Sequence, residues 1–386
     1  MQEDFHYYAT YCAAVLAGLE PEQSADIAYC ANLVDLCSAT MLGELGAPVA
    51  AATTQLQMEM MDIGSDPIGL QTVTRIWSSF HFLPYDLAAK RKGCSKRYLR
   101  KYRLICKPNG ALLAETVGLA QGKGLAAAGI AMHVLADTWA HQNFAGTPSL
   151  VINNTDSEFY ELVPGEEGET ERKISFRHAL GVADDIEQGV YTNTPFQFGE
   201  NSIFCLGHGR AGHLPDYSFA RYRYQPAWAD YELILKDNPS DYRMAFAQMV
   251  YALKRLRLGD APFECERYDF KAIAPYEDRI AAILTERRLD ACDDWRSFGK
   301  ELSGAELASF DVARCQDEYR AAAGEARDAT LLGSFILAAL AQKSMVTNRI
   351  FSSGNPLAGR SVEYRGIIEG IRDYAALLGW KEGETR

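Results

Sequence analysis

Two histidines and one aspartate recur at intervals of four residues within the stretch HVLADTWAHQNF at 133–144. They are His133, Asp137 and His141, and the chain has only seven histidines among its 386 residues. On an α-helix, each step of four residues advances a side chain by about 40° around the axis and about 6 Å along it. The three polar groups therefore form one slowly winding stripe on an otherwise apolar helix. Imidazoles and carboxylates embedded in apolar surface need a partner, and a metal ion suits all three.

Further residues of the same types accompany this stripe. Asp35 lies alone in the apolar stretch CANLVDLCSA, which predicts a buried helical carboxylate with no basic partner nearby. A single histidine on an apolar helix is more often a hydrogen-bonded core residue than a ligand. The His/Asp/His stripe together with a solitary aspartate favours metal, and the lack of a CxxC pair favours a catalytic over a structural zinc site. The remaining histidines are His6, His81, His178, His208 and His213.

The stretch GIAMHVLADTWAHQNFAG resembles the HxxxDxxxH helix of the zinc-dependent phospholipase C and single-strand nuclease superfamily, most closely its Het-C-like branch. The resemblance covers about the first 216 residues and implies an all-α fold, three zinc ions and phosphoric ester substrates. Secreted members of that superfamily also use a free amino group, exposed by signal cleavage, at the second ion. The resemblance implies three groups of ligands: Asp35, His81, His133 and Asp137; Asp137 with His6, for which Asp4 is an alternative; and His141 with His208 and either His213 or Asp216.

This resemblance implies a metal-dependent hydrolase that acts through a metal-bound hydroxide at a multinuclear site. Zinc lowers the pKa of a bound water to about 7, so hydroxide forms at neutral pH. Asp137 and Asp35 are the expected catalytic carboxylates, and the substrate is expected to be a small-molecule or lipid phosphoester. Zinc is the expected metal, in two or three ions, with manganese and iron left open. Two alternatives stay open: a non-catalytic metal-binding interaction or structural protein, and a hydrolase of an amide or other non-phosphate bond.

Composition and charge narrow the class of protein. The chain is 48% hydrophobic and 23% charged, which is typical of a soluble globular protein. Its net charge of −12 disfavours binding of duplex nucleic acid.

The nine cysteines are scattered and odd in number, which predicts free thiols in a reducing compartment. The acidic start has no basic region typical of a secretory signal, and the longest apolar run, 331–341, is too short for a bilayer. We therefore expect a cytoplasmic protein without a transmembrane segment.

Helical periodicity dominates the chain and predicts an all-α multi-helix bundle with long ordered loops. The polar segment 145–175 is expected to be an exposed loop or small hairpin, and the Gly- and aromatic-rich segment 191–226 an irregular ordered loop. Together they form a loop insertion at about 145–226 in a metal-binding core at 1–260. A helical extension at 261–386 packs on this core, or the whole chain is one domain. The predicted helical segments are 4–18, 23–42, 111–142 with a break at QGKG, 239–259, 276–301, 305–350 and 360–379.

Three other features each allow a functional and a structural interpretation. His178 precedes Asp184, Asp185 and Glu187, for which a solvated helix face is favoured over metal ligation. Asn143 either caps the signature helix or lies near the metals. The basic cluster KGCSKRYLRKYR at 92–103 either meets an anionic lipid, RNA or phosphate, or is a solvated basic turn.

Overall fold

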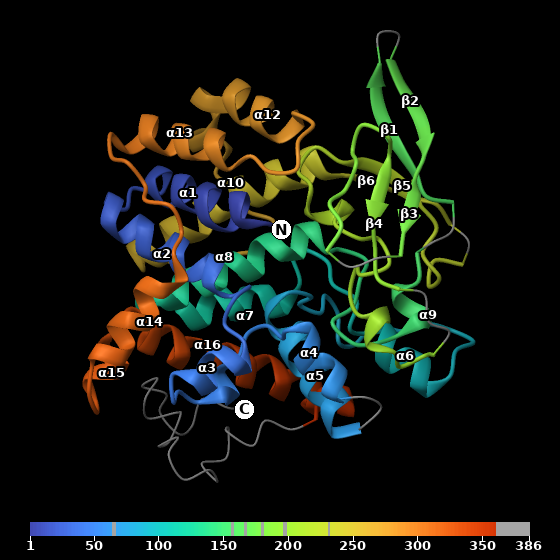
Figure 1. Ribbon diagram of the computed structural model, residues 1–386, viewed down its shortest axis with the longest axis horizontal. Helices are drawn as coiled ribbons and strands as arrows, with labels where there is room; N and C mark the ends of the chain where they lie inside the picture. The colour runs from blue at the N-terminus through green and yellow to red at the C-terminus, as the bar shows by residue number, and fades with distance from the viewer. Residues whose placement is uncertain are drawn as a thin grey trace.

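The helix α8 (Leu125–Ala140), which carries His133 and Asp137 and is followed directly by His141, runs through the middle of the molecule (Figure 1). The structure is a computed structural model that describes residues 1–63, 67–155, 158–165, 168–178, 181–195, 199–230 and 232–359. Every residue of α8 from Ala128 to Ala140 is buried. A helix that is apolar all round is stable only when other elements cover every face. The covering helices are α2 (Pro21–Leu33), α5 (Pro67–Phe80), α7 (Ala111–Ala120), α10 (Asn238–Leu258) and α16 (Leu331–Ser352).

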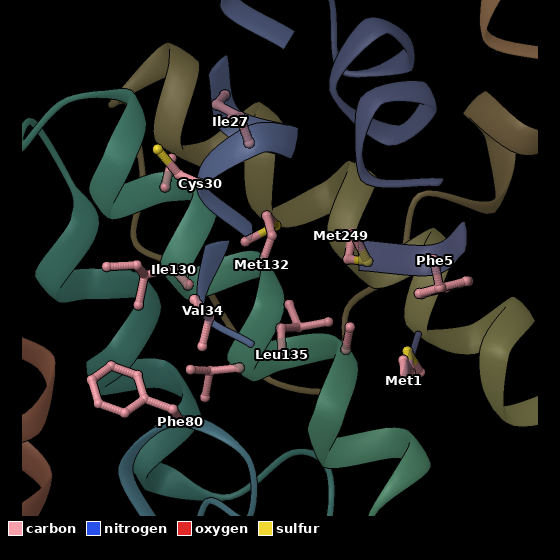
Figure 2. Packing of buried hydrophobic residues seen from close by; sticks show 14 of the residues in the cluster. Met1, Phe5, Ile27, Cys30, Val34, Phe80, Ile130, Met132, Leu135 and Met249 are labelled. Atoms are coloured by element: carbon pink, nitrogen blue, oxygen red, sulfur yellow. The ribbon is translucent and has the colours of Figure 1, made fainter. Parts of the chain in front are cut away.

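The closest of these helix pairs is that of α2 and α8. A Cβ atom on Gly129 would lie 2.5 Å from the carbonyl oxygen of Ile27 and 2.6 Å from Cβ of Cys30, so only glycine fits at this crossing. Figure 2 shows Ile27, Cys30 and Val34 from the α2 side close to the apolar residues of α8, among them Ile130 and Met132. This close approach brings the backbone of α2 next to the polar stripe.

Shorter helical elements surround this central group. The prediction of helices at 4–18, 111–142 and 239–259 is confirmed, whereas 23–42, 276–301 and 305–350 are each divided by turns. The predicted helix at 360–379 lies outside the described residues. The remaining helical elements are the π-helical turn η1 (Asp4–Ala9), α1 (Thr10–Leu16), α3 (Ala39–Glu44), η2 (Val49–Ala51), α4 (Gln57–Ile63), α6 (Lys96–Tyr102), α9 (Leu150–Asn153), η3 (Ile203–Cys205), η4 (Leu214–Asp216), α11 (Phe270–Ile273), η5 (Ala274–Tyr276), α12 (Glu277–Thr285), α13 (Cys292–Ser303), α14 (Val312–Ala321), α15 (Ala326–Ala329) and η6 (Pro356–Ala358).

The prediction of an all-α fold is wrong, because a small sheet stands beside the helices (Figure 1). It is antiparallel, with the strand order β2-β1-β5-β6. A separate parallel pair joins β3 to β4. The strands are β1 (Tyr160–Gly165), β2 (Gly168–Lys173), β3 (Ser175–Arg177), β4 (Val190–Thr192), β5 (Arg221–Tyr224) and β6 (Ile234–Asp237).

The sheet accounts for the segment that the sequence left without helices. The small hairpin expected within 145–175 is present as β1 and β2, paired from Tyr160↔Lys173 to Gly165↔Gly168. The segment 191–226 is not irregular throughout, since it contains β5 and two short 3-10 turns. In β5, Tyr222 and Tyr224 are buried while the two arginines stay at the surface, which is the period of two that a half-buried strand requires.

Two apolar clusters meet around the end of α8. The larger one includes residues from Met1 to Ala358, so helices of the 261–359 segment pack in the same core as α8. The smaller one lies under the sheet and includes Phe82, Phe144 and Tyr224. A boundary between 1–260 and 261–386 stays a prediction. Among the helices of the described residues, none is long and apolar enough to span a membrane.

Candidate metal centre

Segments that are far apart in the sequence bring histidines and aspartates together at the C-terminal half of α8. His6 comes from η1, Asp35 from the turn after α2, and His81 from the residue that follows α5. His208 and Asp216 come from the loop that ends in η4. Three groups of these side chains have ligand atoms within 4.8 Å of one another. The first is Asp35, His81 and His133, the second is His6, His133 and Asp137, and the third is His141, His208 and Asp216.

The first group gathers around one oxygen of Asp137. His81 Nδ1 and His133 Nε2 each lie 3.2 Å from Asp137 Oδ2. The same two nitrogens are 3.3 Å apart. Asp35 Oδ1 lies 3.6 Å from His81 Nδ1, and the Asp35 side chain is 35% exposed. Asp35 is thus not the buried helical residue that the sequence suggested: it stands in a turn, at the solvent side of the group.

The second group uses the other oxygen of Asp137. His6 Nε2 lies 3.2 Å from Asp137 Oδ1, and the His6 ring stacks on His133 with the ring centroids 3.8 Å apart. His6 is fully buried, yet neither ring nitrogen makes a hydrogen bond of good geometry in the part of the chain that the structure describes, and Nε2 has only its contact with Asp137 Oδ1. Buried polar atoms without partners are rare and call for an explanation such as an ion. The wide turn of η1 places this imidazole, in line with the frequent use of π-helical turns at functional sites.

The third group lies at the end of α8. His141 Nε2 is 3.0 Å from Asp216 Oδ1, and His208 Nε2 is 3.5 Å from Asp216 Oδ2. His213 is outside this group, with its side chain 59% exposed and its Nδ1 3.6 Å from Asp216 Oδ2. Between the two alternatives for the third group, Asp216 is therefore the residue that the fold brings to His141 and His208.

Backbone carbonyls orient four of the imidazoles. His133 Nδ1 donates to Ala31 O at 2.9 Å, and His141 Nδ1 donates to His81 O at 2.8 Å. His81 donates through Nε2 to Thr53 O at 3.0 Å, and His208 through Nδ1 to Gly212 O at 2.8 Å. Because a carbonyl oxygen can only accept, the neutral ring carries its proton on that outer nitrogen. The lone pair of the other nitrogen then points into the cluster, which is the usual arrangement of metal-bound histidine.

Electrostatics favour the ligand forms of most of these groups. His81 is the exception: burial alone would lower its pKa, but the hydrogen bond to Asp137 and the charge of Asp35 raise it above the usual value. Burial lowers the pKa of His6 and of His208 to about 4, so both rings are neutral at pH 7. Burial alone would raise the pKa of Asp137, but the neighbouring imidazoles and the Met1 amine hold it well below its usual range. The pKa of Asp216 is lowered in the same way, against the effect of burial. Neutral imidazoles and ionised carboxylates are what a divalent cation binds, so the residues present fit such a cation.

The α-amine of Met1 is the group that sequence reasoning missed. It donates to Asp137 Oδ1 at 3.0 Å, lies 3.1 Å from Asp216 Oδ1, and contacts His141 Nε2 at 3.2 Å. Burial alone would lower the pKa of this amine, but the surrounding carboxylates raise it to about 11. A positive charge thus stands between Asp137 and Asp216. The resemblance could have predicted this group, because secreted members of the superfamily that the signature helix resembles use a free amino group at the second ion.

The remaining candidates have structural partners. Asp4, the alternative to His6, accepts from Phe5 N at 2.7 Å and Ala291 N at 3.0 Å, so it ties η1 to the start of α13. Asn143 has a φ of 79°, and its carbonyl accepts from Trp228 Nε1 at 3.0 Å, so it ends the turn after α8. His178 is exposed, with Nδ1 2.7 Å from Asn193 Oδ1. Asp184 accepts from the Tyr217 hydroxyl and Asp185 from Gln188 N, in a loop and not on a helix face.

Comparison with known proteins adds a family. A family described only as a family of unknown function, DUF6765, matches residues 1–350. No curated protein and no solved structure matches the chain.

Proposed function

We propose that this chain, which belongs to the DUF6765 family because that family matches residues 1–350, is a metal-dependent hydrolase of phosphoric esters. One observation carries the proposal. Imidazole lone pairs and carboxylate oxygens gather at Asp137 and Asp216; the Met1 amine satisfies part of this set, and a divalent cation would satisfy the remaining lone pairs together. The resemblance of the HxxxDxxxH helix to the phospholipase C and nuclease superfamily supports phosphoric esters as the substrate class.

The donor set indicates which ion each group would hold. Nitrogen and oxygen ligands without thiolates suit zinc, and they are also compatible with manganese or iron. Asp137 would serve the first two groups, one with each oxygen, and Asp216 the third. Bound divalent ions of this kind activate water and neutralise the charge on a phosphoryl group.

The residues of the chain position the ligand atoms and determine where a substrate can approach them. The fixed ring orientations hold the ligand atoms in place before any ion arrives, which lowers the entropic cost of assembling the site. Asp35 and His208 are partly exposed and His213 is exposed, so a substrate would approach the cluster at these residues. Burial raises the pKa of the Cys106 thiol well above its usual value, so this cysteine stays protonated and is a poor nucleophile. Water is therefore the nucleophile that the site favours.

The cysteines support a compartment for this reaction. All nine are free thiols in the structure, and six of them are buried. We therefore propose a reducing compartment such as the cytoplasm.

The test compares metal content and hydrolysis in two variants. Asp137→Asn keeps the size of the side chain but removes the charge and one metal-binding oxygen. The metal of the first two groups should therefore be lost, with at most the one ion of the third group retained, and hydrolysis of a phosphodiester such as bis-p-nitrophenyl phosphate should fall to background. His178→Ala removes an exposed imidazole outside the three groups and should retain both. Metal is measured by inductively coupled plasma mass spectrometry on protein tagged at its C-terminus, so that the Met1 amine stays as in the structure.

The outcomes separate the alternatives. Metal bound in up to three equivalents without any hydrolysis would support a binding or structural module instead. Hydrolysis of amides but not of phosphoesters would support the alternative of a metal-dependent hydrolase that attacks a carbonyl carbon instead of phosphorus. Equal loss of metal in Asp137→Asn and His178→Ala would contradict the assignment of the cluster.

A further inference from the structure

Residues 85–103 form a basic segment, which we call the basic excursion. Its two ends adjoin the backbone segments that follow His81 and His141 of the metal centre. Pro84, three residues after His81, pairs with Cys106. Ile105 pairs with Ala145, four residues after His141. The backbone N–H of Cys106 donates to Phe144 O at 2.7 Å. The excursion is therefore held between two segments that end in metal-centre histidines, and α6 at its tip lies at the edge of the molecule beside α9 (Figure 1).

The excursion concentrates positive charge in a protein whose net charge is −12. Five of its cations are exposed and have no ion-pair partner in the described parts of the chain. They are Lys90, Lys92, Lys96, Arg97 and Arg100. An attractive field for an anionic partner is thus local to this surface, which we call the basic surface.

Other residues of the excursion fix the shape of the basic surface. Arg91 pairs with Asp230, and Lys101 is buried against Glu200 and Asn201. Glu200 in turn accepts from Ser149 Oγ at 2.9 Å, which joins α6 to the start of α9. Arg103 Nε donates to Ala89 O at 2.9 Å across the base of the excursion. The five unpaired cations are therefore presented by a rigid element.

The aromatic residues of this surface argue against single-stranded nucleic acid as the partner. Tyr98 and Tyr102 stack on each other at 6.2 Å with an interplanar angle of 20°. The guanidinium of Arg91 lies over both rings, at 5.7 Å and 5.2 Å from the centroids. Arg91 thus covers one face of each of these two rings and leaves Tyr85 as the exposed aromatic side chain of the excursion, whereas proteins that bind single strands offer several open aromatic faces to successive bases.

The neighbouring apolar residues fit a lipid surface instead. Tyr85 at the start of the excursion is 44% exposed, and Val151 on the adjoining α9 is 38% exposed. Exposed cations on the same segment as an exposed aromatic side chain, with an exposed aliphatic side chain on the adjoining helix, suit the headgroup region of a bilayer, where the charge meets phosphate and the apolar groups enter the interface. We propose that the basic surface docks the protein on an anionic bilayer, next to the frame of the metal centre. This docking does not depend on the proposed hydrolase activity.

Vesicle cosedimentation tests the proposal with the full chain. Phosphatidylcholine vesicles with about a quarter phosphatidylglycerol should bind the protein at low salt, and pure phosphatidylcholine should not. High salt should weaken binding, because exposed charges are screened. Replacing three cations, Lys92→Gln, Lys96→Gln and Arg97→Gln together, should lower the partition coefficient on the order of a hundredfold.

A matched control changes the charge by the same amount elsewhere. Lys173→Gln, Lys271→Gln and Lys300→Gln alter three exposed lysines on β2, α11 and α13 and should leave vesicle binding unchanged. Circular dichroism confirms that both triple variants fold. The proposal is overturned if neither vesicle binds, if both triple variants lose binding equally, or if the wild type binds a uridine oligonucleotide but no vesicle.

Discussion

At the scale of single residues, the metal centre is defined by where each imidazole places its second nitrogen. His133, His81, His141 and His208 each donate outward to a backbone carbonyl. His6 is the exception, since it has no hydrogen bond at either nitrogen within the described structure. An orphaned imidazole costs stability without an ion and gains it with one. His6 is therefore the residue at which metal-free and metal-loaded protein should differ most.

We predict that His6→Leu has opposite effects on the two forms. Metal-free protein should unfold at the same temperature or higher, because removing a buried group without partners recovers about 1–3 kcal/mol of desolvation cost. The stabilisation gained on adding zinc should shrink, because one ligand of the second group is gone. Thermal unfolding with and without zinc measures both effects. His213→Ala, beside the third group but not in it, should keep the full zinc effect; a His6→Leu loss of similar size in both forms would argue against metal at His6.

The candidate residues could be predicted from the sequence because ligand chemistry restricts them to a few types. Seven histidines in the chain left few combinations, and the spacing of four placed three ligands on one helix. The Met1 amine was missed because every chain has an N-terminal amine, so its presence in the sequence does not indicate that it lies in a site. The choice between His213 and Asp216 depended on the turn η4, which no spacing rule predicts.

At the scale of elements, the contact between α2 and α8 positions the first group. The carbonyl of Ala31 on α2 accepts from His133 of α8 at 2.9 Å, so the separation of the two helices determines the ring orientation. That separation depends on the missing side chain at Gly129, one turn before His133. A larger residue must push α2 away, together with the carbonyl that orients His133.

We predict that Gly129→Ala destabilises the protein and weakens metal binding. The added Cβ would meet backbone at 2.5 Å, and overpacking of this kind costs about 1–3 kcal/mol, more than the gain in helix propensity of about 1 kcal/mol. Gly118→Ala on α7 is the matched control, since its Cβ would meet nothing within 4 Å and it should be neutral or slightly stabilising. Chemical denaturation and zinc titration of both variants check this; equal behaviour would contradict the role of the crossing.

Elements could be predicted where the sequence repeats with a helical period, and only in part where they are short: the β1–β2 hairpin was one of two expectations for its segment, and the other strands were not expected. The long helices α8 and α10 carry many turns of pattern, so their existence was clear. The strands have only three to six residues, and β2 is almost entirely exposed, so it shows no apolar alternation. Such strands form because β1 and β5 offer unpaired backbone groups, which is a tertiary cause.

At the scale of the whole molecule, the cluster joins parts of the chain that the fold otherwise keeps in separate apolar cores. Phe82 of the smaller core stacks on His141 at 4.7 Å, while His133 lies among residues of the larger core. The sheet, the basic excursion and the N-terminal turn all reach the helical body next to these histidines. Ions at this junction would fix the two cores to each other.

Removal of metal should therefore loosen the junction and leave the helical body folded. After chelation with EDTA, we expect amide exchange to rise at residues 1–9 and 206–216, which supply His6, His208 and Asp216. The buried centre of α16 should stay protected, because it supplies no cluster residue itself and packs against both α5 and α8. The unfolding free energy should fall by up to about 4 kcal/mol for each site that had been held at a thousand times its dissociation constant. Exchange that rises equally in α16 would mean global unfolding, and exchange that does not rise at all would mean that protein contacts alone hold the junction.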